Sequence, residues 1–162
     1  MIILGIDPGT VKTGYALLES DPIKLLDYGV IIPPPKALIS EKYKIIYESV
    51  SHLIDLHKPD YLAVETQYVH KNIQSAIKLG MARGVIVLAA AQKGVKISEF
   101  APSMTKKALS GKGHASKWQI QKMAQVLLNM QELPSEDAAD AIAVATACIN
   151  TLKFRGSHVL LS

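Results

Sequence analysis

The chain opens with a short apolar stretch that ends in a single carboxylate. Residues 2–6 read Ile-Ile-Leu-Gly-Ile, and Asp7 follows directly, before Pro8 and Gly9. A nearly continuous apolar run of this length predicts a strand buried on both faces of a sheet, and Pro-Gly predicts the turn that ends it. An aspartate at the tip of a buried strand lies beside the core, where an unpaired charge is costly. Two interpretations are open at this point: Asp7 caps the turn, or other carboxylates converge on it.

Three further carboxylates bear on this choice. Residues 61–65, Tyr-Leu-Ala-Val-Glu, form a second apolar stretch, and Glu65 is its final residue. Asp137 and Asp140 are three residues apart at the start of a predicted helix, so they share one face of its first turn. Small residues follow them in that helix and allow it to lie close against the sheet. The helix macrodipole explains Asp137 alone, but it leaves Asp7 and Glu65 unexplained, so we expect the four carboxylates to meet.

Four clustered carboxylates repel one another unless a cation lies between them. The oxygen-only set, with no Cys or paired His nearby in the sequence, favours Mg²⁺ or Mn²⁺ over Zn²⁺. Two such ions about 3.5–4 Å apart clamp a phosphodiester in many nucleases. The expected cofactor is therefore Mg²⁺, two ions per site, with Mn²⁺ able to substitute.

Length and composition predict one globular domain. The chain has 162 residues, 49% of them hydrophobic and 20% charged, which is enough to form an ordinary core. No apolar run of about 18 residues is free of charge, so we expect no spanning helix and no membrane partner, and we see no signal peptide. The single cysteine, Cys148, excludes an internal disulfide and suggests a reducing compartment, with a small buried core residue as its expected role.

The pattern along the chain predicts an α/β fold, a mixed sheet with helices on its faces. Its first three strands are separated by hairpin-sized gaps and should be antiparallel. A lysine-rich, glycine-broken segment at 101–117 is assigned no element. The domain is expected to span residues 1–151, with residues 152–162 a loose tail. The predicted strands are 2–7, 13–19, 25–32, 61–65 and 95–100, and the predicted helices are 41–57, 72–93, 116–130 and 135–151.

The predicted helix at 72–93 is almost entirely apolar after Arg83, so it needs cover on more than one side. Gly80 and Gly84 lie four residues apart, on one face, and would allow another helix to approach closely. Either this face forms a homodimer or it is buried inside the monomer, and the sequence leaves both open.

Positive charge is concentrated in one part of the chain. Residues 70–123 contain ten Lys or Arg and a single acid, Glu99, whereas the remainder has eight basic and thirteen acidic residues. Solvated helix faces account for some of these lysines, such as Lys78 and Lys93. A concentrated positive half beside isolated carboxylates is also typical of a nuclease that holds a polyanion.

Four motifs together resemble one known family. They are Gly5-Ile6-Asp7-Pro8-Gly9-Thr10 with Thr13-Gly14-Tyr15, the segment from Pro59 to Glu65, the segment from Ala76 to Val85, and Asp137-Ala138-Ala139-Asp140-Ala141. In this order and spacing they resemble the RuvC-type Holliday junction resolvases, members of the RNase H-like superfamily, from residue 2 to about 150. The first motif alone is weak, because actin-like proteins begin in the same way.

The resemblance implies an RNase H-like fold, with a five-stranded mixed sheet and helices on both faces. It implies a dimeric, metal-dependent endonuclease that resolves four-way DNA junctions in recombination and repair. Such an enzyme nicks two strands of like polarity symmetrically and leaves 5′-phosphates. The family's acidic tetrad matches Asp7, Glu65, Asp137 and Asp140, as catalytic residues and metal ligands, with Asp7 bridging the two ions.

The same resemblance suggests DNA-contacting residues: Tyr68, Lys106, Lys107, Lys112 and Lys117. Lysines bind phosphate without reading sequence, and Lys117 is the residue we expect to offset charge at the scissile phosphate. Tyr68 matches a family aromatic that stacks on unpaired bases, although packing is a common role for a tyrosine after a strand. His114 is either a phosphate contact or an ordinary loop residue, and Trp118 is assigned nothing.

The implied partners are four-way junction DNA, a second copy of the chain, and a branch-migration helicase complex of the RuvA and RuvB type. The implied location is the bacterial cytoplasm, at the nucleoid. Three alternatives remain: a small RNA-processing nuclease of the same superfamily, an actin-type nucleotide-binding module, and a DNA-binding protein without catalysis. The second needs two such domains, and the intact tetrad argues against the third.

Overall fold

A single mixed sheet forms the centre of the molecule. The computed structural model describes residues 1–66 and 72–159, with side chains up to Phe154. The strands are β1 (Ile2–Asp7), β2 (Thr13–Ser20), β3 (Ile23–Ile31), β4 (Tyr61–Glu65) and β5 (Lys96–Phe100), in the order β3-β2-β1-β4-β5. β1 to β3 are antiparallel, while β4 runs parallel to both β1 and β5. The predicted sheet and its antiparallel start are confirmed.

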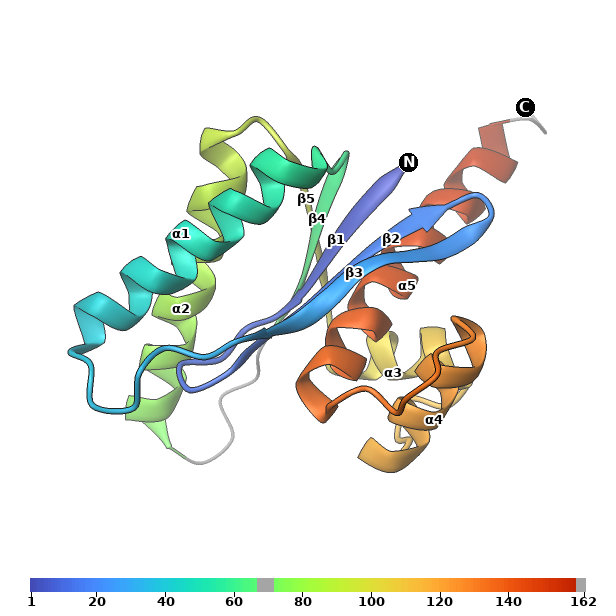
Figure 1. Cartoon of the computed structure of the whole chain (residues 1–162). Helices are drawn as coiled ribbons and strands as arrows, with labels where there is room; N and C mark the ends of the chain where they lie inside the picture. The colour runs from blue at the N-terminus through green and yellow to red at the C-terminus, as the bar shows by residue number, and fades with distance from the viewer. Residues whose placement is uncertain (67–71, 160–162) are drawn as a thin grey trace.

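Helices cover both faces of this sheet (Figure 1). α1 (Ile39–His57) and α2 (Ile73–Gln92) lie on one face, and α3 (Pro102–Ser110), α4 (Lys117–Leu127) and α5 (Glu136–Val159) lie on the other. The core on the α1–α2 side is built from large aliphatic residues such as Leu4, Ile46 and Val64. On the other side, alanines of α5 pack against the sheet and against α3 and α4.

α5 lies unusually close to the sheet because glycines face it. A Cβ added at Gly5 of β1 would stand 2.4 Å from the carbonyl oxygen of Ala141, and one at Gly14 of β2 would stand 1.9 Å from that of Asp137. Both approaches are shorter than any side chain tolerates. The glycines on the strands and the alanines on the helix therefore permit the contact together.

Two expectations from the sequence are wrong. The segment 101–117 contains a helix, α3, which starts at Pro102, ends at Ser110 and is capped by Gly111 in the left-handed conformation. Proline in the first turn and glycine after the last turn are helix boundary signals, and the lysine-rich composition concealed them. The prediction of a loose tail from residue 152 is also wrong over residues 152–159. α5 continues to Val159, and Leu152 packs against the core.

α2 carries a stripe of exposed apolar residues. Four of its large side chains are about half exposed or more, at helical spacing on one face: Ile73 (71%), Ile77 (57%), Met81 (52%) and Leu88 (49%). Gly80 and Gly84 have open space where a Cβ would point, so no residue among 1–66 and 72–159 covers this face. α2 also has the length and composition of a membrane-spanning helix, although Lys78 and Arg83 interrupt its apolar sequence.

Candidate active site

The two strand-end carboxylates are neighbours across the sheet. Ile6 pairs with Val64 in the parallel β1–β4 ladder, and the next residues are Asp7 and Glu65. Both side chains are half-buried at the carboxyl ends of central strands. The sequence pattern predicted this placement, because each acid follows directly on a buried apolar run.

The start of α5 brings the other two carboxylates to the same end of the sheet. Asp7 pairs with Gly14 in the β1–β2 ladder, and Gly14 contacts the backbone of Asp137 so closely that no Cβ would fit between them. Asp140 lies one turn further along α5 and is half-buried. The structure therefore places all four predicted acids at one end of the sheet, from three separate elements.

Ionising this group is costly. The pKa of Asp7 is raised from 3.8 to about 8, mainly by burial and also by the charges of Glu65, Asp140 and Asp137, while the charge of Lys117 lowers it. Burial likewise raises the pKa of Glu65 and of Asp140 above their ordinary values. The group is thus a place where a cation is strongly favoured.

Thr105 contacts one of the four acids, Glu65, and was not predicted from the sequence. Its side chain is buried on the inner face of α3, and its hydroxyl donates a hydrogen bond to Glu65 Oε1 at 2.8 Å and lies 2.9 Å from the carbonyl oxygen of Pro102. Burial raises the pKa of the Glu65 carboxyl, and the hydrogen bond from Thr105 offsets part of that rise. No sequence motif indicated this role, because it depends on the undetected helix α3.

Lys106 and Lys117 both act on the carboxylates. The charge of Lys106 lowers the pKa of Glu65 and of Asp140. Lys117, at the start of α4, donates a hydrogen bond to Glu136 Oε2 at 2.5 Å, and this pair raises the pKa of the lysine. The charge of Lys117 also lowers the pKa of Asp7, so its ammonium lies within electrostatic range of the acidic group.

The donor set fits a hard divalent cation. Four carboxylates offer oxygen ligands only, which suits Mg²⁺ or Mn²⁺. Within the part of the chain that the structure describes, no three His, Cys, Asp or Glu side chains stand close enough together to hold a metal ion. Metal ligation by the four acids therefore requires their side chains to turn toward one another, and it stays a prediction.

The remaining predicted DNA contacts differ in their placement. Lys107 on α3 and Lys112 in the α3–α4 loop are exposed, as a phosphate contact requires. Tyr68 lies outside the described residues. His114, in the same loop, and Trp118, in the first turn of α4, are also exposed.

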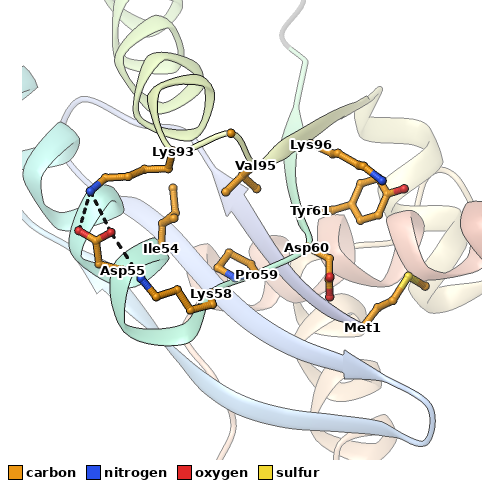
Figure 2. Close-up of a pocket in the computed structure, with 11 residues that line it drawn as sticks. Met1, Ile54, Asp55, Lys58, Pro59, Asp60, Tyr61, Lys93, Val95 and Lys96 are labelled. Carbon is orange, nitrogen blue, oxygen red and sulfur yellow. Dashed lines mark hydrogen bonds and ion pairs between the residues drawn. The ribbon is translucent and has the colours of Figure 1, made fainter.

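A hollow lies at the other end of the sheet. It has a volume of about 480 Å³ and is lined by residues at the amino ends of β1, β4 and β5, among them Met1, Tyr61 and Lys96. Its charges pair with one another, since Asp55 accepts from Lys93 at 2.8 Å and lies 4.0 Å from Lys58 (Figure 2). This hollow is a poor candidate for the site.

Known proteins resemble this chain over nearly its whole length. The family described as "Crossover junction endodeoxyribonuclease RuvC" matches residues 3–148. A protein of that name from Protochlamydia amoebophila is 53% identical over 148 residues, which cover 90% of this chain and 88% of the relative. One from Chlamydia caviae is 44% identical and covers 93% of each chain.

Solved structures agree with the sequence relatives. Thermus thermophilus RuvC superposes with a TM-score of 0.83 at 29% identity, covering 94% of this chain and 96% of that one. The same protein in complex with a Holliday junction substrate gives a TM-score of 0.83 at 30% identity, covering 91% and 92%. The fold is the RNase H-like fold of these resolvases. This chain belongs to the RuvC family of crossover junction endodeoxyribonucleases.

Proposed function

We propose that this RuvC-family nuclease resolves four-way DNA junctions with Asp7, Glu65, Asp137 and Asp140 as its metal-binding catalytic residues. The observation that carries the assignment is the arrival of four acids from β1, β4 and α5 at one end of the sheet. A cluster that raises the pKa of Asp7 to about 8 is costly to fold. Such a cost is typical of a catalytic site rather than of a structural one.

Two Mg²⁺ ions, when bound, supply an activated water and stabilise the leaving oxygen. Mn²⁺ suits the same oxygen donors. The residues of the chain have distinct tasks around these ions. Asp7, between Glu65 and the start of α5, would help to hold them together with the other three acids, and Thr105 would orient one oxygen of Glu65. Lys106 and Lys117 offset the charge that develops on the phosphate.

The lysine-rich helices provide the DNA-binding surface. The Thermus thermophilus relative has been solved with a Holliday junction substrate, and we propose that a junction binds here with Lys106, Lys107, Lys112 and Lys117 on its phosphates. Tyr68 is proposed to stack on unpaired bases. Phosphate contacts give affinity and salt dependence but no sequence preference.

Two symmetric nicks require two active sites, so we propose a homodimer. The exposed stripe on α2 is the surface that supports it, because it is apolar and its two glycines leave room for a partner helix. The proposal also includes a branch-migration helicase complex of the RuvA and RuvB type as a partner and a bacterial cytoplasmic location at the nucleoid. The chain forms a single nuclease domain that includes α5 as far as Val159.

The test compares substrates and metal. A four-way junction, a linear duplex and an RNA–DNA hybrid are offered to the wild type and to Asp7→Asn, with Mg²⁺ or with EDTA. We expect junction-selective binding in every condition and paired nicks only for the wild type with Mg²⁺. Preferential cutting of the hybrid would instead favour RNA processing, and nicking by Asp7→Asn at the wild-type rate would remove Asp7 from the site.

A further inference from the structure

Trp118 is the single tryptophan of the chain, and its side chain is 61% exposed. It lies in the first turn of α4, next in the chain to Lys117, whose ammonium bonds to Glu136 at the start of α5, beside Asp137. Met123, 40% exposed, lines the same cavity as Trp118, and an exposed apolar patch rimmed by polar residues marks a binding site. None of the tasks described above uses this ring.

A small cavity lies against the indole. Its volume is about 200 Å³, and its lining includes Lys112, Trp118, Lys122 and Met123. Cavities that enclose a whole drug-sized ligand measure about 300–1,000 Å³, so this one suits a single flat ring. Lys122 is one helical turn after Trp118, on the same face of α4, and it donates to the neutral amide oxygen of Gln125.

The lysines around the cavity favour the binding of a polyanion. Residues 101–131 contain five lysines and no Asp or Glu. The large hollow at the other end of the sheet differs in this respect, because Asp55 pairs there with Lys58 and Lys93 (Figure 2). Lysines that flank an exposed aromatic are typical of surfaces that bind a nucleic acid strand, with a base on the ring and phosphates on the cations.

We propose that Trp118 is a stacking platform for an unpaired base of the DNA strand held at the active site, with Lys112 and Lys122 on the adjacent phosphates. The inference deepens the proposed function and rests on it, since the strand that reaches Trp118 is the one whose phosphate lies at the carboxylates. A duplex offers no free base face, so the platform favours the opened centre of a junction over an intact helix.

The indole itself reports the contact, because the chain has no second tryptophan. A fluorescently labelled four-way junction is titrated into the wild type in EDTA, with anisotropy measuring occupancy and Trp118 emission measuring stacking. We expect emission to fall in step with occupancy. A single-stranded oligonucleotide should quench it as well, and a blunt duplex bound to the same occupancy should quench it much less.

Variants then measure the contribution of the ring. Stacking on one base is worth about 1–3 kcal/mol, so Trp118→Ala should weaken junction binding about 5- to 150-fold, and Trp118→Phe should recover most of the loss. Val126→Ala, a control at a residue that is 73% exposed on the same helix, should bind as the wild type does. Lys122→Gln should reduce the slope of log K against log salt by about one, and Lys44→Gln on α1 should leave it unchanged.

Three outcomes would overturn the inference. They are unchanged emission at saturating junction, wild-type affinity in Trp118→Ala, and equal quenching by the blunt duplex, which would indicate a backbone contact instead of stacking. A fall in emission with protein concentration alone would mean that the ring binds protein, and it would equally overturn the inference. Each result leaves the proposed function standing as long as junction nicking still depends on Asp7, so the two failures are distinguishable.

Discussion

Asp7 illustrates the cost of this site at the scale of one residue. Its carboxyl is half-buried beside three others, and its pKa rises from 3.8 to about 8. The folded protein therefore holds a proton there that the unfolded chain releases above about pH 4. As pH rises from about 4 to 8, the folded state loses stability relative to the unfolded state.

Replacing Asp7 by Asn removes this dependence. In EDTA, we expect Asp7→Asn and the wild type to unfold at the same temperature near pH 4. By pH 8 the variant should be more stable by at least about 1 kcal/mol, which is about 2–4 °C for a chain of this size. Thermal unfolding across this pH range measures the difference. Parallel curves for the two proteins would show that the pKa of Asp7 is not raised.

Thr105 offers a test of how Glu65 is held. Thr105→Val keeps the shape of the side chain but removes the hydroxyl that bonds to Glu65 Oε1, whereas Thr105→Ser keeps the hydroxyl. Losing a group that orients a metal ligand typically costs about 10- to 100-fold in activity or metal affinity. We expect that loss in the single-turnover nicking rate of Thr105→Val, near-wild-type rates for Thr105→Ser, and equal junction affinities in EDTA.

The affinity measurement separates positioning from damage to the fold. If Thr105→Val nicks as fast as the wild type, then the hydroxyl does not position Glu65. If both variants lose junction affinity together, the role of Thr105 is structural.

The sequence predicted where the four carboxylates lie in the fold but not which residues contact them, for a physical reason. Asp7 and Glu65 follow buried apolar runs, so local pattern alone places them at strand ends. Thr105 and Glu136 act through contacts with residues 40 and 19 positions away. Neither contact can be predicted from a local sequence pattern, because both depend on how α3, α4 and α5 pack in the folded chain.

At the scale of elements, the site depends on how closely α5 approaches the sheet. The alanines of α5 were visible in the sequence as small residues that permit close packing. Gly5 and Gly14 were visible only as parts of a motif, and the structure shows that they accept the helix backbone. α3 escaped prediction because its Pro102 and Gly111 boundaries lie in a lysine-rich segment that resembled a loop.

Gly14→Ala tests this packing. The new methyl group would stand 1.9 Å from the carbonyl oxygen of Asp137, so α5 must move away from β2. We expect a loss of about 1–3 kcal/mol in the free energy of unfolding by urea, together with loss of nicking. Val126→Ala is the control, because this side chain on α4 is 73% exposed, and this variant should unfold and nick as the wild type does. Equal stability of Gly14→Ala and the wild type would contradict the close approach.

At the scale of the whole molecule, the two faces of the sheet have different tasks. α3, α4 and α5 build the site on one face, and α1 and α2 cover the other (Figure 1). The apolar stripe on α2 is exposed, and none of the other described elements packs over it. The sequence left a dimer and internal burial equally open for this helix, because periodicity shows that a face is apolar but not what covers it.

A charge in the stripe should separate the proposed dimer. We expect Met81→Glu to sediment as a monomer at concentrations where the wild type sediments as a dimer, and to lose the paired nicks that a dimer makes. Leu56→Glu, at a residue of α1 that is 63% exposed, should sediment as the wild type does. A wild type that is monomeric at every concentration would contradict the dimer.

The most direct test of the central claim is to locate the metal. Crystals of the protein grown with Mn²⁺ and measured at the manganese absorption edge should show two anomalous peaks about 3.5–4 Å apart. Asp7 should contact both, and Glu65, Asp137 and Asp140 should complete their ligands. Peaks confined to other residues, or four carboxylates that bind no ion at saturating Mn²⁺, would contradict the account.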